Sequence, residues 1–335
     1  MKRLISSLGI MLIVFMLFST TGCRKAATAK DDKKITVTSV IFPSYDFVRA
    51  IAKDRVNNIL MISPGSESHS FEPSPKDILN IQNSNIFIHN GGESDKWLQR
   101  IFQSANINRS KILTMMDVVD LVEEEIVEGM ETGGEYDDDD DDDDHYDQHD
   151  HMADNDHEEL EYDEHVWTSP KNAIIIIRAI TEILCEADAA NSAFFQQNAD
   201  AYIQELKKID FAFEEIVAGA KRKTIVFGDR FPFRYLANTY GLKYYAAFPG
   251  CSTQTEPSVA TVAFLINKIR SEKIPVIFHL ELTNDKVAST ISEETGAKKL
   301  MLHSAHNVSM RDFNSGLTYL DIQKRNVQNL KEALW

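Results

Sequence analysis

Short runs of β-branched residues alternate with amphipathic segments along most of this 335-residue chain. Alternation of this kind is typical of βαβ units built on a parallel sheet, so it places the chain in the α/β fold class. It occurs in two series, and each series predicts a small α/β layer of its own. The predicted strands are 35–40, 58–62 and 86–88 in the first series, and 224–227, 244–247, 276–279 and 300–302 in the second.

A long helix is predicted between the two series. From about Ser192 to Ala220, apolar residues recur in alternating steps of four and three, which is the spacing of one helix face. A helix of this length would measure about 40 Å and could connect two lobes as a strut. The expected organisation is an N-terminal lobe over 34–190, a linking helix over 191–221 and a C-terminal lobe over 222–335.

The N-terminus has the pattern of an export signal. Two basic residues precede a fifteen-residue apolar stretch from Leu4 to Phe18, and small residues follow. Cys23 comes next and resembles the lipidated cysteine of a bacterial lipoprotein signal. We therefore expect 1–22 to be a signal peptide, Cys23 to carry the lipid and 23–33 to be a tether that holds the protein outside the membrane. The remaining cysteines are Cys185 and Cys251, and the sequence does not decide whether they form a disulfide.

The acidity of the chain is local. The formal net charge is −17, but residues 131–165 hold 19 carboxylates and no Lys or Arg, and without them it becomes +2. The rest of the chain has no charge excess that would indicate nucleic-acid binding. The segment 131–164 has the low complexity of a disordered loop, since it has too few apolar residues to form a core.

Histidines are interleaved with these carboxylates, and imidazoles shift the preference of such a tract towards Zn²⁺, Ni²⁺ or Cu²⁺. We expect the loop to capture metal weakly at many sites. A charge run that only keeps the chain soluble is the alternative. The loop histidines are His145, His149, His151 and His157.

Two further histidines lie in similar local sequence. His69 lies in a loop rich in Pro, Gly and Ser between a strand and a helix, and His165 lies where the acidic loop gives way to a helix. Each precedes a Ser-Pro pair that begins a helix. A loop between a strand and a helix is where an open α/β sheet places its ligands.

The segments SHSFEPSPKDI, HVWTSPKNA and FRYLANTYGLKY, together with the long helix, resemble the metal-binding lipoproteins of bacterial zinc and manganese ABC importers, the ZnuA/TroA-like cluster. The resemblance covers about residues 33–335. It implies two small parallel-sheet lobes, with helices on both faces, joined by one rigid helix. It also implies one metal ion in the cleft between the lobes and an ABC permease as partner.

The resemblance assigns His69 and His165 as the first two metal ligands. The third ligand of the family is a histidine, and the corresponding stretch here reads GDRFPFRYL. An ungapped alignment places Arg230 at the histidine position, and an alignment with one inserted residue places Asp229 there. Arg stays protonated and does not ligate, which leaves Asp229. His303 takes the aligned place of the fourth ligand. The expected set is His69, His165, His303 and Asp229, with His306, His279 and Glu281 as possible additional ligands.

This donor set favours zinc, because manganese prefers more oxygen ligands. We expect a monomeric solute-binding protein that captures Zn²⁺ and delivers it to a permease. The alternatives are a Mn²⁺-specific protein of the same cluster, or a metal-binding surface adhesin or storage lipoprotein without a transporter. An enzyme is not expected, since the zinc-hydrolase motif HExxH and the serine-hydrolase motif GxSxG do not occur.

Overall fold

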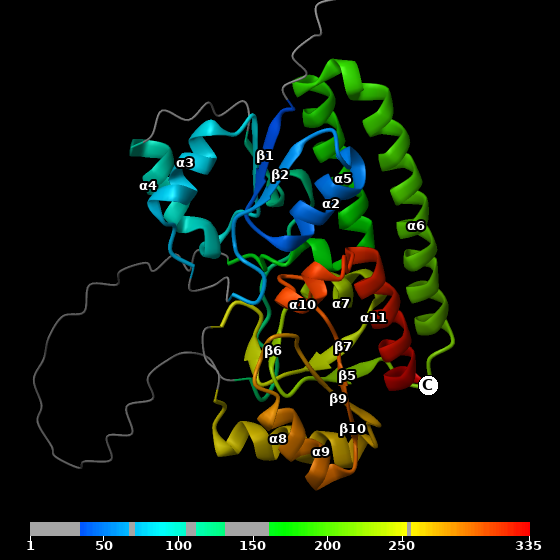
Figure 1. The fold of residues 1–335 in the computed structure, drawn as a ribbon. Helices are drawn as coiled ribbons and strands as arrows, with labels where there is room; N and C mark the ends of the chain where they lie inside the picture. The colour runs from blue at the N-terminus through cyan, green and yellow to red at the C-terminus, as the bar shows by residue number, and fades with distance from the viewer. Residues whose placement is uncertain (1–33, 67–70, 105–111, 131–160, 253–255) are drawn as a thin grey trace, which may run out of the picture. The chain divides into compact units, whose positions relative to one another are not determined.

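The computed structural model describes residues 34–66, 71–104, 112–130, 161–252 and 256–335 (Figure 1). The predicted signal peptide, Cys23, His69 and the four loop histidines lie outside the described residues. In the part of the chain that is described, no helix is long and apolar enough to cross a bilayer.

The N-terminal lobe is built on a parallel sheet. Its strands lie in the order β2-β1-β3-β4, and each neighbouring pair is parallel, as the alternation predicts. The strands are β1 (Thr36–Ser39), β2 (Asn57–Leu60), β3 (Ile86–His89) and β4 (Ile112–Thr114). The helices are α2 (Phe42–Ala52), α3 (Pro75–Asn83), α4 (Lys96–Ser104) and α5 (Pro170–Ala187), with short 3₁₀ turns at Glu93–Asp95, Met116–Val118, Val166–Thr168 and Ala189–Asn191.

Local sequence accounts for where these helices begin. Ser74 caps α3: its hydroxyl accepts a hydrogen bond from the Asp77 N–H, and the Asp77 carboxylate accepts one from the Ser74 N–H. Pro75 and Pro170 open α3 and α5, at positions where a missing N–H costs nothing. These two helices follow the loops that contain His69 and His165.

The C-terminal lobe repeats the parallel arrangement in smaller pieces. The pairs β5-β7 and β9-β10 are parallel, and a single bridge between Phe227 and Phe278 connects them. Two-residue strands β6 (Arg230–Phe231) and β8 (Phe248–Pro249) form a third pair. The other elements are β5 (Thr224–Val226), β7 (Lys243–Tyr245), β9 (Val276–His279), β10 (Lys298–Met301), α7 (Arg234–Tyr240), α8 (Val259–Glu272), α9 (Lys286–Thr295), α10 (Met310–Asn314) and α11 (Tyr319–Leu334).

The long helix α6 spans Ser192–Ala218 and passes alongside both lobes (Figure 1). Its first half contributes Phe195 and Leu206 to the N-terminal core, and its second half contributes Phe213 and Ile216 to the C-terminal core. One continuous apolar face therefore serves two cores, so the helix couples the lobes through packing and not only through the chain.

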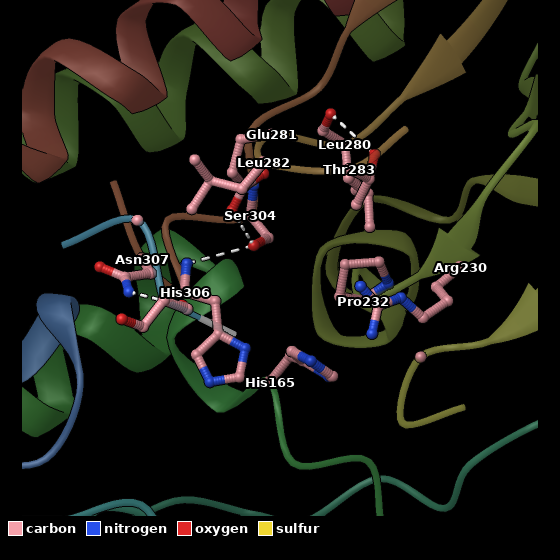
Figure 2. A pocket seen from close by; sticks show the side chains of 13 residues that line it. His165, Arg230, Pro232, Leu280, Glu281, Leu282, Thr283, Ser304, His306 and Asn307 are labelled. Carbon is pink, nitrogen blue, oxygen red and sulfur yellow. Dashed lines mark hydrogen bonds between the residues drawn. The ribbon is translucent and has the colours of Figure 1, made fainter. Parts of the chain in front are cut away.

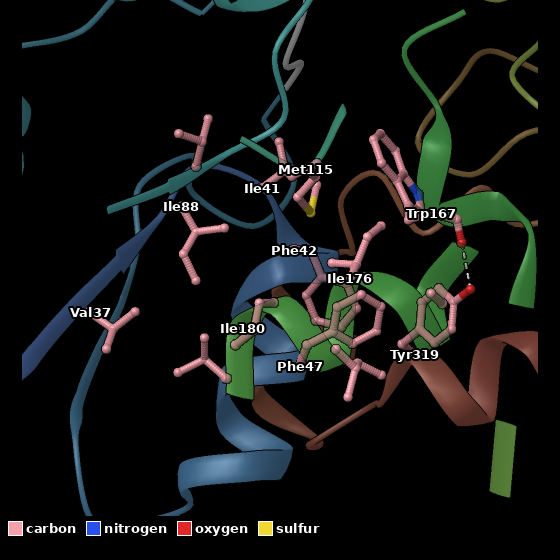
Figure 3. Packing of buried hydrophobic residues seen from close by; sticks show 14 of the residues in the cluster. Val37, Ile41, Phe42, Phe47, Ile88, Met115, Trp167, Ile176, Ile180 and Tyr319 are labelled. Carbon is pink, nitrogen blue, oxygen red and sulfur yellow. Dashed lines mark hydrogen bonds between the residues drawn. The ribbon is translucent and has the colours of Figure 1, made fainter. Parts of the chain in front are cut away.

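Helix α11 also contacts both lobes. Tyr319 at its start is fully buried in the N-terminal core, where its hydroxyl donates to the carbonyl of Trp167 at 2.6 Å (Figure 3). Leu330 and Leu334 at its other end are buried in the C-terminal core. Helix α11 therefore begins in the core of the N-terminal lobe and ends in the core of the C-terminal lobe.

One expectation about a sequence segment needs correction. The predicted disordered loop 131–164 extends too far, because Glu161–Glu164 are placed and both Asp163 and Glu164 are buried. These residues look like the rest of the acidic run, but hydrogen bonds to neighbouring loops hold them. Cys185 and Cys251, whose pairing the sequence leaves open, are free thiols.

Candidate metal centre

A cavity of about 130 Å³ lies between segments of the two lobes (Figure 2). From the N-terminal lobe, Gly65, Ser66 and His165 line it. The remaining lining residues come from loops at the strand ends of the C-terminal lobe. They are Arg230, Pro232, Gly250, Leu280, Glu281, Leu282, Thr283, Ser304, His306 and Asn307.

His165 lies between the acidic segment and the 3₁₀ turn that leads into α5, and it is 1% exposed. Its Nδ1 lies 3.3 Å from the Asp163 carboxylate, which also accepts the His165 backbone N–H at 2.8 Å. When Nδ1 carries the proton towards Asp163, Nε2 is left with its lone pair. This is the tautomer that a metal-binding imidazole needs, and the carboxylate holds the ring in one orientation.

His306 lies beside His165 in the pocket. The two ring centroids are 5.5 Å apart and the rings are nearly perpendicular. The buried indole of Trp167 packs against both rings, 5.5 Å from His165 and 5.0 Å from His306, and its Nε1 donates to the Ser304 carbonyl at 2.8 Å. Two imidazoles from different lobes therefore share one rigid apolar support.

The turn that carries His306 is tightly built. Ala305 has a positive φ of 63°, its N–H donates to His303 Nδ1, and the His306 N–H donates to the Ser304 hydroxyl. Asn307 extends the turn across to the N-terminal lobe, where its amide donates to the carbonyls of Ser63 and Ser66 at 2.9 Å each. The side chain of His306 is thereby held against the N-terminal lobe.

Gly250 allows the opposite wall to approach His165 closely. A Cβ atom at this position would lie 3.0 Å from the Asp163 carboxylate and 3.3 Å from Cε1 of His165. Such contacts are tighter than carbon atoms normally make, so a side chain here would push on the pair that orients the imidazole.

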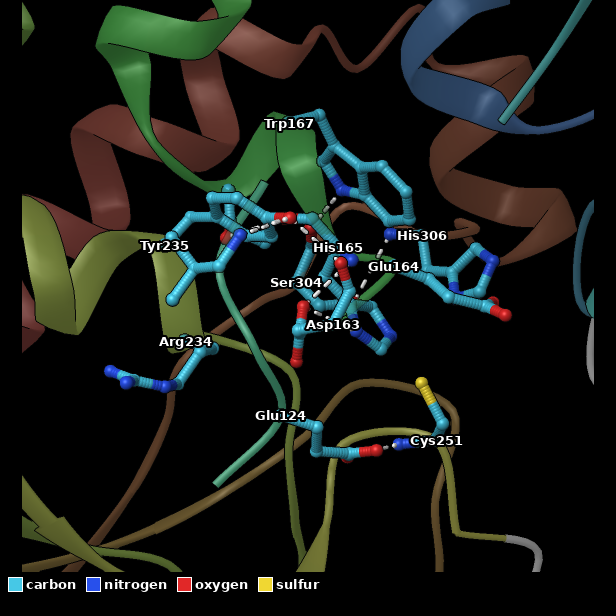
Figure 4. Close-up of polar contacts among 12 residues, drawn as sticks. Glu124, Asp163, Glu164, His165, Trp167, Arg234, Tyr235, Cys251, Ser304 and His306 are labelled. Carbon is cyan, nitrogen blue, oxygen red and sulfur yellow. Dashed lines mark hydrogen bonds and ion pairs between the residues drawn. The ribbon is translucent and has the colours of Figure 1, made fainter. Parts of the chain in front are cut away.

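The acidic side chains of Asp163, Glu164 and Glu124 lie close enough to His165 to act on its charge (Figure 4). Burial by itself lowers the pKa of the His165 imidazole, but Asp163, Glu164 and Glu124 together outweigh it and leave the pKa raised. Burial raises the pKa of Glu124 and of Glu164. Burial and the same carboxylates also raise the pKa of the Cys251 thiol, which keeps it protonated and a poor metal ligand.

Glu281 lines the cavity, but its carboxylate is already engaged. It accepts hydrogen bonds from the backbone N–H and the hydroxyl of Ser304, and His303 Nδ1 lies 3.4 Å away. Its main structural effect is to hold the turn that carries His306.

The structure separates two of the expected ligands from the cavity. Asp229 accepts hydrogen bonds from the Thr283 hydroxyl at 2.6 Å and from the Arg230 N–H at 2.8 Å, and it does not line the pocket. His303 is tied to α11 by Asn326, which accepts its N–H and donates to its carbonyl. The described residues place Arg230 and His306 in the pocket instead.

The other candidate ligands are distributed as follows. His279 Nδ1 donates to the carbonyl of Leu280 and lies outside the lining of this cavity. His69 lies outside the described residues, three positions after Ser66 of the lining. Within the described residues, no three His, Cys, Asp or Glu side chains are close enough to hold a metal ion by themselves.

Sequence reasoning overlooked Asp163 and Gly250. In the sequence Asp163 looks like part of the acidic run, although its spacing of two residues from His165 is a signal that it could orient the ring. Gly250 offered no signal beyond the Pro-Gly turn, because its role depends on a chain segment 85 positions earlier approaching it in space.

Comparison with known proteins places this geometry in context. Residues 37–333 match the family model described as ZnuA, zinc-uptake complex component A periplasmic. The chain is 30% identical over 331 residues to the high-affinity zinc uptake system protein ZnuA of Bacillus subtilis, covering 98% of this chain and 97% of that one.

A second relative is the zinc-binding lipoprotein AdcA of Streptococcus pneumoniae, 30% identical over 302 residues. This match covers 90% of the chain but only 56% of the AdcA length. The crystal structure of the Zn(II)-bound ZnuA-like domain of the same AdcA superposes with a TM-score of 0.70 at 28% identity, over 90% of this chain and 99% of that domain.

Proposed function

The chain belongs to the ZnuA family of zinc-uptake complex components, and we propose that it is the extracytoplasmic solute-binding component of a metal ABC importer. It captures Zn²⁺ between its lobes and delivers it to the membrane permease. The family and the names of its relatives are those of metal-binding transport proteins, not of an enzyme. The observation that carries the proposal is the pair His165 and His306, a buried and a half-buried imidazole from different lobes in one cavity.

The ligand set that we propose differs from the one expected from sequence. His165 and His306 supply two nitrogens, and His69 supplies a third from the loop that follows Ser66. Asp229 and His303 are left out because neither lines the cavity, the Asp229 carboxylate accepts from the Thr283 hydroxyl, and the His303 Nδ1 accepts from the Ala305 N–H. Three imidazoles suit zinc, which is commonly four-coordinate with nitrogen and oxygen ligands, better than manganese.

The finer parts of the proposal concern segments outside the described residues. Cys23 anchors the protein to the membrane through a lipid, and the tract with His145, His149, His151 and His157 collects metal near the pocket. Many weak sites on one chain raise the local zinc concentration without requiring a tight site of their own.

Calorimetry on the mature chain from residue 24 tests the proposal, with Zn²⁺ and Mn²⁺ titrated separately. We expect one tight Zn²⁺ per chain in the wild type, and an affinity at least tenfold weaker in His165→Ala and in His306→Ala, since each change removes a ligand nitrogen. His279→Ala removes an imidazole outside the cavity and is the matched control.

The same titration separates the two ligand sets. Retention of tight binding in His303→Ala and Asp229→Asn supports the set that contains His306. Loss of tight binding in those variants, with binding retained in His306→Ala, would restore the set expected from sequence. Equal zinc affinity in His165→Ala and wild type would contradict the site altogether.

A further inference from the structure

The mouth of the cavity is bounded by residues of both lobes. The cavity is partly open to solvent, and three of the described residues that line it are exposed: Gly65, Ser66 and Leu282. A residue that lines a cavity and also faces solvent lies at its opening. Leu282 is 50% exposed and has the longest side chain of the three (Figure 2). Its apolar side chain therefore borders the path of a metal ion into the pocket.

The backbone on either side of Leu282 is held in place. The carboxylate of Glu281 accepts hydrogen bonds from the backbone N–H and the hydroxyl of Ser304. The hydroxyl of Thr283 donates to the Asp229 carboxylate at 2.6 Å. The leucine therefore projects from a fixed segment of the cavity wall.

The opposite rim is attached to the turn that begins at Ser304. The Gly65 N–H donates to the Val308 carbonyl at 2.8 Å, and the Asn307 amide donates to the Ser66 carbonyl at 2.9 Å. Because both rims are hydrogen-bonded to this turn, their backbones resist separation. Rotation of the leucine side chain is the easier way to widen the mouth.

Leu282 has a left-handed backbone conformation, with a φ of 57°. This conformation is unfavourable for a leucine, and glycine or asparagine adopts it at a lower cost. In the part of the chain that the structure describes, Leu282 belongs to none of the three buried apolar clusters. Strained residues of this kind gather at ligand sites, where the side chain has a task that the backbone conformation does not explain.

We propose that the Leu282 side chain is a gate that controls how fast metal enters and leaves the pocket. A hydrated cation gains no favourable contact from an apolar group, so the ion passes when the leucine has rotated aside. The gate acts on the path and not on the bound state, so it slows entry and release by the same factor and leaves the affinity unchanged. This inference rests on the proposed zinc-binding function and adds to it the residue that sets the exchange rate.

Stopped-flow fluorescence on the mature chain measures both rates with zinc alone. Trp167 packs against the rings of His165 and His306, so its emission reports the arrival of zinc, and excess chelator starts the release. Leu282→Ala removes most of the side chain, and Leu282→Gly also relieves the backbone strain. We expect both rates to rise about tenfold in each variant, the factor for a gate that is open about 10% of the time.

Leu79→Ala is the matched control, because Leu79 is an exposed leucine on α3 outside the cavity lining. Its rates should equal those of the wild type. A rise in Leu282→Gly alone would overturn the inference, since the backbone and not the side chain would then control exchange. A change in only one of the two rates would also overturn it, since the leucine would then contribute to affinity.

The failure of this inference is distinguishable from that of the proposed function. Wild-type rates of entry and release in both Leu282 variants, with tight zinc binding retained, would overturn the gate and leave the proposed function intact. Absence of tight zinc binding in the wild type would overturn the proposed function and this inference together.

Discussion

At the scale of single residues, the carboxylate of Asp163 has the most direct control over the candidate site. It is 1% exposed, it lies 3.3 Å from Nδ1 of His165, and it accepts the His165 backbone N–H. The backbone of Asp163 is held in turn, since the Tyr235 hydroxyl donates to its carbonyl at 2.9 Å. The orientation of the imidazole thus depends on a residue that would not itself touch the metal.

Asp163→Asn is expected to weaken zinc binding by about 10–100-fold, because the amide no longer stabilises the required tautomer or adds basicity to the ring. The measurement is a competition titration against a zinc chelator of known affinity. Because the fold should persist, the thermal unfolding midpoint without metal should change much less than the affinity.

Glu164→Gln is the matched control for this change. Glu164 is the buried neighbour of Asp163, but its carboxylate accepts hydrogen bonds from the backbone and hydroxyl of Ser94 and not from His165. If both variants lose the same zinc affinity, Asp163 acts through general packing of the segment and not by orienting the ring.

At the scale of secondary-structure elements, Asp46 ties three helices together. It lies on α2, where its carboxylate pairs with the Arg49 guanidinium and accepts the backbone N–H of Tyr319 at 2.7 Å and the hydroxyl of Tyr202 at 3.3 Å. Arg49 also donates to the Leu317 carbonyl just before α11. The start of α11 is therefore fastened to the first lobe by a buried polar network.

Asp46→Ala is expected to lower the free energy of unfolding by about 3–5 kcal/mol. The change leaves the buried N–H of Tyr319 and the hydroxyl of Tyr202 without their acceptor, and it removes the ion-pair partner of the half-buried Arg49. Urea denaturation followed by far-UV circular dichroism gives the value. Asp54→Ala, on the same lobe at an exposed position, should change it by less than about 0.5 kcal/mol. A comparable loss in both variants would argue against the network.

At the scale of the whole molecule, two long helices pack into the cores of both lobes, and residues of both lobes line the cavity. Helices α6 and α11 contribute to both cores, while His165 and His306 bring their lobes to one cavity. A ligand bound by residues of both lobes stabilises the folded arrangement, because unfolding would release it.

Zinc at about a thousandfold excess over its dissociation constant is expected to raise the free energy of unfolding by about 4 kcal/mol, and a chelator should remove the gain. Deletion of 131–160 should leave this stabilisation unchanged, because the residues around His165 and His306 remain. Differential scanning calorimetry with zinc and with EDTA compares the two forms. Stabilisation that disappears with the deletion would place the tight binding in the acidic-His tract instead.

Local patterns in the sequence were sufficient for the architecture. The alternation of strand and helix runs predicted the α/β class, and the steps of four and three between Phe195 and Ile216 predicted the long helix that is found at Ser192–Ala218. Such periodicities depend only on neighbours along the chain, so they can be recognised without the tertiary structure. The helix start at the Ser-Pro pair after His69 is confirmed for the same reason, since Ser74 caps α3 and Pro75 opens it.

The position of each candidate ligand relative to the cavity depended on the tertiary structure. His303 and His306 lie three residues apart after the same strand, and their sequence contexts do not tell them apart. The positive φ at Ala305 and the attachment of His303 to Asn326 turn His306, and not His303, towards His165. The side-chain positions of Asp229 and Arg230 depend likewise on distant residues. Asp229 accepts a hydrogen bond from Thr283, and Arg230 donates one to Ser252, each more than 20 positions away in the sequence. Sequence alone predicted the α/β class and the long helix, because these follow from local order. The cavity wall was decided only where distant loops meet, because side-chain direction in a turn depends on the partners that hold it.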